Sequence, residues 1–476
     1  MNVTVVAGPL AELLNPETAW PKIEANLRTA LGGETLHVLA TSGPLQRLIG
    51  LHDVPLSLQA TLPGARAHLE GNVSNLAAPT GLQLAARIEI DDLAQTATRF
   101  TASRLPALPF SATGRITLGD GEVAVDGLNA QAGKSDAAGR LRIRWRDRPT
   151  LSADLTSRLI DVTQWEEPTA NETPVLDRPL RMPTLLSRDA QLRLRAERFL
   201  LHRYDLARLQ LDGTLTNGLI ELSTSATEGD LHGELRLDLR QAVPAAALRL
   251  SLKDVETGAL YTARAGPSGA ARPSLSIGGQ LAGAGTTLRH MLATGRGEFL
   301  LTAGAGTLPI GSGYGFERVA GNLLLALVPG RRAADHTQLE CAAARFTIAD
   351  GVATSSDGVA LRLTDLDILG GGAVNLSTSE ILFGYRAVRR NFFQFSLLGL
   401  TSGVAQVTGT ISDPKIELDP RGMLLVGTAA WATAGVSLLA GDLWRKLEST
   451  ANPCARIAAG AQLSRDPLEI LIRSSR

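Results

Sequence analysis

The sequence predicts a mostly β protein built on antiparallel sheet. Three observations favour this fold class. Apolar and polar residues alternate with a period of two, Gly-containing turn signals separate the alternating runs, and a four-strand unit recurs along the chain. Hydrophobic residues make up 44% of the 476 residues but aromatic residues only 4%, so the apolar surface is mainly Leu, Val, Ile and Ala.

The alternation puts one apolar face and one polar face on each strand. In "GRLRIRWRD", for example, Leu141 and Ile143 alternate with arginines. A sheet with one face in water is typical of antiparallel pairing. The apolar positions of the alternating runs are Ile116, Leu118, Val123, Val125, Leu141, Ile143, Leu192, Leu194, Leu235, Leu237, Leu361 and Leu363.

The breaks between runs carry turn chemistry. Asn-Gly and Asp-Gly pairs between apolar runs are strong hairpin signals, because both residue types accept positive φ angles. We also expect the Gly-Gly-Gly at residues 370–372 to break the chain between strands. The predicted turn pairs are Asp120-Gly121, Asp212-Gly213, Asn217-Gly218 and Asp350-Gly351.

A loose internal repeat starts at Gly114 and again at Gly213, with a weaker third copy over residues 346–381. Each copy reads as strand, turn, strand, Gly-rich turn, strand, turn and strand. A repeated unit of this kind suggests an elongated stack of strands. A pair of ordinary β-sandwiches would produce the same pattern and stays open as an alternative.

Helical patterns are few, at residues 16–31, 91–100 and 286–294 and in the C-terminal tail. The uncharged run 423–441 has 19 residues, long enough to span a bilayer, but its Ala, Gly, Thr and Ser content favours a buried or interfacial helix. A Pro-rich stretch suits an extended connector. The expected parts are an N-terminal β segment (1–165), this connector (166–190), a C-terminal β segment (191–420) and a helical tail (421–476).

Composition and motifs argue against several function classes. The 47 basic and 47 acidic residues cancel, which gives no electrostatic attraction to nucleic acid. The scattered histidines form no metal-binding motif, and neither a phosphate-binding loop nor a Ser nucleophile elbow is present. We therefore predict no enzyme activity, no metal and no cofactor. The two cysteines, Cys341 and Cys454, are either free thiols or one disulfide.

Several segments together resemble the AsmA family. "FSATGRITLGDGEVAVDG…RDRPTLSADLTSRLIDV" is similar to its repeating segment, and "VLDRPLRMPTLLSRDAQLRLRAERFLL" to its connector. "LECAAARFTIADGVATSSDGVALRLTDLDILGGGAVNLSTSEI" resembles its distinctive C-terminal block, "VAQVTGTISDPKIELDP" its closing strand and "NPC" its terminal tail. The resemblance extends over roughly residues 55 to 460.

The resemblance implies a bridge-like lipid transfer protein of the Gram-negative cell envelope. Family members are anchored in the inner membrane by an N-terminal helix, which is missing here. A long, curved and twisted antiparallel sheet projects into the periplasm, and its open apolar groove is thought to carry phospholipid toward the outer membrane. The resemblance also implies that the alternating apolar residues named above line the groove, and that a Cys341–Cys454 disulfide ties a C-terminal helix to the last strands.

Two other functions remain open at this stage. One is a β-rich scaffold that assists outer-membrane protein assembly through exposed strand edges. The other is a compact β-sandwich binding module whose apolar faces pack on each other.

Overall fold

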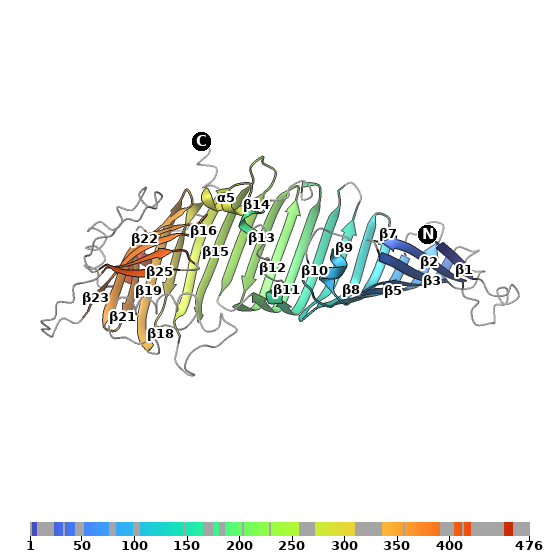
Figure 1. Ribbon diagram of the computed structural model, residues 1–476, viewed down its shortest axis with the longest axis horizontal. Coiled ribbons are helices and arrows are strands. Elements are labelled where there is room, and N and C mark those ends of the chain that lie inside the picture. The colour runs from blue at the N-terminus through green and yellow to red at the C-terminus, as the bar shows by residue number, and fades with distance from the viewer. Residues whose placement is uncertain are drawn as a thin grey trace. The chain divides into compact units, whose positions relative to one another are not determined.

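The alternating segments form β-strands throughout the part of the chain that the structure describes (Figure 1). The structure is a computed structural model, and it shows a mostly β fold with only short helices. By its internal packing the chain divides into unit 1 (Met1–Ala170, Pro183–His202 and Leu206–Gly218) and unit 2 (Asn171–Met182, Arg203–Asp205 and Leu219–Arg476). The described residues are 2–6, 23–31, 34–42, 52–75, 82–98, 105–145, 148–164, 175–179, 186–201, 204–227, 230–256, 272–309, 336–355, 358–390, 404–411, 414–419 and 452–459.

Unit 1 is a meander of neighbouring strands. From β1 to β10 each strand pairs antiparallel with the next one in the chain. Its elements are β1 (Asn2–Val6), β2 (Ile23–Leu31), β3 (Glu34–Ser42), β4 (His52–Leu62), β5 (Ala65–Asn75), β6 (Leu82–Ile90), α3 (Leu93–Ala97), β7 (Phe110–Gly119), β8 (Glu122–Ala132), β9 (Ser135–Arg144), β10 (Thr150–Asp161), the 3₁₀ turn η1 (Val162–Gln164), β11 (Asp189–Leu201) and β12 (Tyr204–Thr216).

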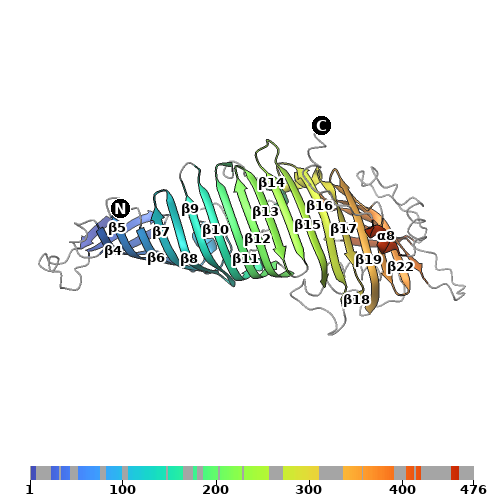
Figure 2. The ribbon, with the colours of Figure 1, turned by 180° about the vertical axis from the view of Figure 1, so that it is seen from behind.

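Unit 2 is also built mainly of β-strands (Figure 2). Strands β13 to β17 form an antiparallel meander, and β17 pairs with β19. Both β20 and β21 lie between β19 and β22, and β22 to β25 form a second meander. The elements are the 3₁₀ turn η2 (Val175–Asp177), β13 (Leu219–Ala226), β14 (Leu231–Asp238), β15 (Ala245–Glu256), β16 (Ser274–Ala284), α5 (Leu288–Ala293), β17 (Arg296–Ala303), β18 (Gly306–Pro309), β19 (His336–Ala349), β20 (Val352–Thr354), β21 (Val359–Leu363), β22 (Leu366–Asn375), β23 (Ile381–Arg389), β24 (Val404–Gly409), β25 (Pro414–Asp419) and α8 (Pro453–Ala458).

The pairing of β10 with β11 departs from the antiparallel arrangement. Strands β10 and β11 run parallel, with Thr150 opposite Asp189 and Asp161 opposite Leu200. A parallel pair needs a crossover of a dozen or more residues, whereas antiparallel neighbours need only a tight turn. The Pro-rich segment that we expected to separate two halves is this crossover. The boundary between the units falls instead after Gly218.

The two short helices expected within residues 91–100 and 286–294 are present. Helix α3 begins after Asp92, whose carboxylate accepts a hydrogen bond from the Gln95 amide, and α5 begins after Thr287, whose hydroxyl accepts one from the His290 amide. Both are side-chain N-caps, which satisfy amides that the helix itself leaves unpaired. The helix expected over residues 16–31 is wrong for residues 23–31, which form β2. The candidate membrane run 423–441 lies outside the described residues.

Two predicted breaks are also wrong. Asp212-Gly213 lies inside the 13-residue strand β12, and Gly370 to Gly372 lie inside β22. A glycine is compatible with a strand interior when a neighbouring side chain needs the space above it. Asp350-Gly351 does form the turn between β19 and β20, with φ angles of 48° and 75°. Positive φ at both positions is what a two-residue hairpin turn of type I′ requires.

A β-bulge in β8 keeps the apolar pattern of unit 1 in phase. Val125 lies opposite Leu141 and Leu128 lies opposite Gly139, so β8 uses three steps where β9 uses two. The extra residue lets Leu128 point to the same side as Val125, although their odd separation would otherwise put them on opposite faces. Gly127 makes this possible with a φ of +60°.

We predict that Gly127→Val loosens β7 to β9. A side chain would have room there, because no atom lies within 4 Å of an added Cβ, so the whole cost is the backbone conformation. For a β-branched residue that cost is about 1–2 kcal/mol. Hydrogen exchange of the β7 to β9 amides should become faster. Gly119→Val is the control, since its Cβ would meet nothing closer than the Glu122 carbonyl oxygen at 3.8 Å and its φ is not positive. Equal protection in both variants would contradict the bulge's role.

Candidate functional site

Unit 1 presents one continuous apolar face. Residues that lie opposite each other in neighbouring strands point to the same side of a sheet, so the strand register identifies which side chains share a face. Eight of the predicted groove residues lie on this face, and one of them, Leu194, lies opposite Leu155. One longer row runs through Leu84, Ile116, Val125, Leu141, Ala153 and Leu192, and a second through Leu82, Leu118, Val123, Ile143 and Leu151.

The apolar face of unit 1 is open to solvent at β9 and β10. Ile143 is 46% exposed and Leu151, directly opposite it, is 44% exposed. Their neighbours Leu141, Val123 and Val125 are only half-buried. Large apolar side chains that stay this exposed in adjacent positions are unusual in a soluble protein, where such surface normally binds something.

The opposite face of unit 1 is polar. Arg144 Nε lies 2.6 Å from a carboxylate oxygen of Glu122, and Arg158 Nε lies 3.4 Å from Asp136. Both pairs join different strands. Exposed pairs like these contribute little stability, but they keep this face in water, so the two faces of the sheet have opposite affinities for solvent.

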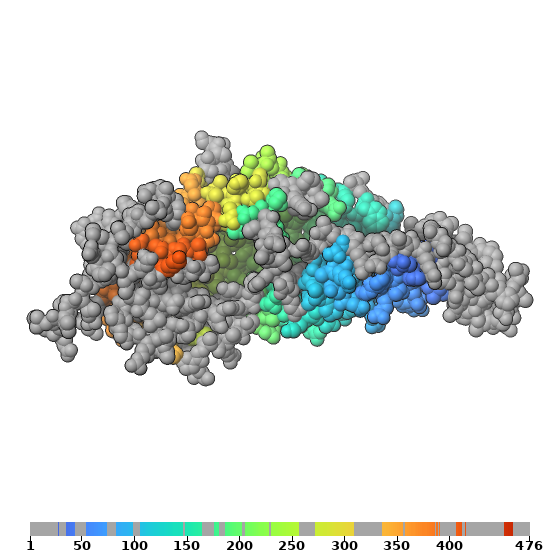
Figure 3. All heavy atoms as spheres, viewed as in Figure 1, coloured from blue at the N-terminus to red at the C-terminus, as the bar shows by residue number. Residues whose placement is uncertain are grey.

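Unit 2 carries an apolar face with the same construction. Leu235 and Leu237, both predicted groove residues, are half-buried on it. Figure 3 looks onto this face, which is hollowed below α5 (yellow). Its rows run through Leu222, Leu235, Leu248 and Leu281, through Ile220, Leu237 and Ala246, and through Leu252, Ile277, Leu301, Ala344 and Val359.

The sheet of unit 2 curls strongly at its later strands. Phe346 in β19 and Phe383 in β23 have ring centroids 6.1 Å apart in an edge-to-face contact. Three strand spacings separate β19 from β23, which is roughly 14 Å on a flat sheet. The two rings meet because Phe383 leans over Gly372 of β22 and the apolar face is concave there.

Glycines give the aromatic rings space on this concave face. Phe299 lies over Gly279, where an added Cβ would come within 2.1 Å of the ring, and Tyr385 lies over Gly370, where it would come within 2.2 Å. Both rings therefore lie flat against the neighbouring strand. Burial raises the pKa of the Tyr385 phenol well above its usual range, which keeps the group neutral.

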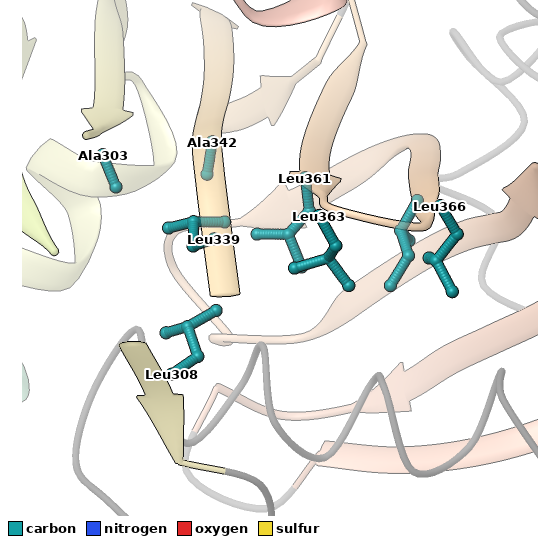
Figure 4. Close-up of a cluster of buried hydrophobic side chains, with 8 residues drawn as sticks. Ala303, Leu308, Leu339, Ala342, Leu361, Leu363 and Leu366 are labelled. Atoms are coloured by element: carbon teal, nitrogen blue, oxygen red, sulfur yellow. The ribbon is translucent and has the colours of Figure 1, made fainter. Parts of the chain in front are cut away.

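Where the sheet curls most, the apolar face is closed. Leu361 and Leu363 were expected to line an open groove, but they are 6% and 0% exposed and belong to a buried cluster (Figure 4). Tyr385, Ala387 and Val407, from β23 and β24, pack against this cluster and help to cover it. The cluster comprises Ala303, Leu308, Leu339, Ala342, Leu361, Leu363, Leu366 and Ile368.

An apolar cavity lies next to this cluster, under helix α5. Its volume is about 340 Å³, and side chains from five neighbouring strands and from α5 line it. Phe299 and Leu301 come from β17, and Leu292 comes from the helix. The remaining lining residues are Leu281, Phe346, Ile348, Ala353, Val374 and Leu376.

Helix α5 is fixed at the rim of the sheet by direct backbone contact. Added Cβ atoms at Gly283 and Gly351 would come within 2.1 Å of Met291 and 2.6 Å of Ala293 carbonyl oxygens. The Thr294 hydroxyl donates to the Ala284 carbonyl at 2.7 Å, and the Gly351 amide donates to the Gly295 carbonyl at 2.9 Å. The helix is thus held between β16 and the β19–β20 turn.

A polar clasp ties the Pro-rich crossover to α5. The Arg289 guanidinium contacts both carboxylate oxygens of Asp177, at 2.5 and 2.9 Å, and also donates to the Ser377 carbonyl. Pro179 forms a β-bridge with Thr287 beside it. The hydrogen bonds from Arg289 hold the pKa of the Asp177 carboxyl below its ordinary value of 3.8.

The outer face of unit 2 is covered by helix α8. Ile457 and Cys454 pack among Ala343, Ala360 and Leu369, which point away from the concave side. A disulfide joins Cys341 to Cys454, whose Cα atoms are 6.3 Å apart. The bond attaches α8 to β19 and closes a loop of 113 residues.

The cavity and the clasp are the parts of the site that sequence reasoning missed. The alternation in "GEFLLT" and "ARFTIA" would have assigned Phe299, Leu301, Phe346 and Ile348 to an apolar face. No sequence signal paired Asp177 with Arg289, which are 112 positions apart.

Two other kinds of feature are absent from the described residues. Among them no three His, Cys, Asp or Glu side chains gather in a way that could hold a metal ion. In the same ranges, no helix combines the length and the apolar character needed to cross a bilayer. Comparison of the chain with family models, with curated proteins and with solved structures finds no match.

We predict that Arg289→Lys opens the clasp, because an ammonium cannot contact both oxygens of Asp177 in the way a guanidinium does. Amide exchange at Val175–Asp177 should become several-fold faster. Arg240→Lys, which removes a comparable contact to Asp238 (2.6 Å), is the control and should leave that exchange unchanged.

A lowered carboxyl pKa stabilises the folded form above pH 3.8, and this contribution is lost as the pH falls through the folded-state value. The clasp of the unaltered protein should therefore persist at mildly acidic pH and open only below 3.8. Opening at pH 5 would contradict the assignment.

We predict that reduction of the Cys341–Cys454 bond destabilises unit 2 by about 2–4 kcal/mol, because the unfolded chain regains the entropy of a long loop. Thermal unfolding with and without reductant measures the loss. The double variant Cys341→Ser/Cys454→Ser should unfold at the lower temperature and ignore the reductant. Alkylation of both thiols in unreduced protein would show that the bond is absent.

Proposed function

We propose that this chain carries phospholipid along the apolar faces of its two units, in the periplasm between the inner and outer membranes, in support of outer-membrane biogenesis. The observation that carries the proposal is the in-register apolar surface left uncovered in unit 1, where Ile143 and Leu151 are 46% and 44% exposed. The compartment and the two membranes come from the resemblance to the AsmA family.

The energetics favour an aliphatic, open face for this task. Moving a phospholipid through water exposes roughly thirty methylenes, at about 0.8 kcal/mol each, or about 25 kcal/mol in total. A face of Leu, Val and Ile removes most of this barrier by replacing water along the chains. Because the rows contain few polar groups, no position on the face would hold one headgroup strongly.

The exposure also favours a conduit over two sheets packed face to face. In a sandwich, the inner residues of each sheet interdigitate with those of the other and are buried. Ile143 and Leu151 lie in the middle of the predicted inner face and are not buried. Lipid bound along the face would explain how such a surface avoids aggregation.

We predict that Ile143→Glu slows phospholipid transfer between donor and acceptor vesicles roughly tenfold, which corresponds to about 1.4 kcal/mol. Since Ile143 is half-exposed, the protein should fold normally. Leu237→Glu should act in the same way in unit 2. The control is Thr113→Glu, which puts the same charge on the polar face of β7, opposite Arg87. Native mass spectrometry should find phospholipid on the unaltered protein. An empty protein, together with equal transfer by all three variants, would refute the proposal.

A further inference from the structure

The cavity under α5 is bounded on one side by the helix. At the cavity, α5 stands across the rim of β16 and the β19–β20 turn, with Leu292 pointing into the space. A chain that lies under α5 meets the side chain of Leu292 at the rim.

The lining selects hydrocarbon. All nine lining residues are apolar, so none offers a charge or a side-chain hydrogen bond to a ligand. Placing a phosphate, an ammonium or a carboxylate among them would strip its water without replacing it, which is strongly unfavourable. The nearby polar groups do not help, since the Arg289 guanidinium is turned to Asp177 and Ser377.

The volume suits part of one chain. An apolar cavity of about 150 Å³ holds a six-carbon ring, so the 340 Å³ here has room for roughly ten to twelve carbons.

We propose that this cavity receives the methyl end of a single acyl chain, so that a lipid on unit 2 lies with its tail under α5 and its headgroup away from it. Helix α5 then limits how far the acyl chain extends on the face of unit 2, and the contact between Arg289 and Asp177 holds the helix in place. This inference rests on the proposed function, because it assigns a direction to a lipid that the apolar face carries.

The test uses the full-length protein and two photoreactive palmitic acids, one with a diazirine at the last carbons and one with it next to the carboxylate. After irradiation, the labelled peptides are mapped by mass spectrometry. The terminal diazirine should label the peptides of Phe299, Phe346 and Leu376 several-fold more than the diazirine near the carboxylate.

Two variants test whether labelling by the terminal diazirine depends on the cavity. Ala353→Leu adds three carbons inside the cavity, and it should reduce terminal labelling there several-fold. Ala85→Leu makes the same change on the exposed polar face of β6, opposite Arg115 and outside the cavity, and should leave that labelling unchanged. Circular dichroism shows whether either variant unfolds. The comparison of the two probes on the unaltered protein does not depend on the variants.

The outcomes separate the inference from the proposed function. Equal labelling of the cavity by both probes, or stronger labelling by the probe near the carboxylate, overturns the inference. Labelling along the face but never in the cavity overturns the inference and leaves the proposed function standing. If neither probe labels any apolar-face peptide in either unit, both are wrong, and a protein partner becomes the better candidate for the face.

Discussion

The fold depends on keeping the alternating apolar side chains of successive strands on one side of the sheet. A slip of one residue in any pairing would turn all later side chains to the other face. Bulges maintain the phase. Gly127 in β8 and Asp254 in β15 take positive φ angles of 60° and 50° at points where the strand register shifts. In β19 the extra residue is Glu340, and it keeps Leu339 on the same face as Ala342. An interrupted alternation in the sequence is thereby restored to a continuous face.

The same alternation produces both an open face and a closed core, and local curvature decides between them. Where side chains are aliphatic and the neighbouring strands carry residues of similar size, as around Ile143, the face stays open. At β19 to β23 aromatic rings and glycines face each other, the sheet curls, and Phe346 meets Phe383 across it. Leu363 is buried there, under side chains from β23 and β24, although its strand reads like the others.

The sequence predicted the strands and the shared face well because both follow from local spacing. Ile116, Val125, Leu141 and Leu192 are members of one row, as their alternation indicated. It could not predict which parts of the face are covered, since burial of Leu361 depends on residues from β23 and β24. The parallel pairing of β10 with β11 was also missed. The proline content indicates that the segment between them is not a strand, but it does not indicate whether the flanking strands pair with each other or in which direction.

Glycine was the residue that sequence reasoning interpreted least well. Asp350-Gly351 and Gly370 look alike as chain breaks, yet the first forms a hairpin turn and the second lies within a strand under the ring of Tyr385. The difference lies in the cross-strand neighbour, which local sequence does not reveal. The cavity under α5 depends on several such neighbours at once, so it could not be predicted from the sequence.

The disulfide between Cys341 and Cys454 affects what happens when a protease cleaves the chain between them. Strands β20 to β25 all lie between the two cysteines in sequence. A single cut by a protease anywhere in that stretch leaves two fragments that remain joined through sulfur. The end of the molecule that holds the most strongly curled strands can thus be nicked once without being shed, as long as its surroundings are oxidising.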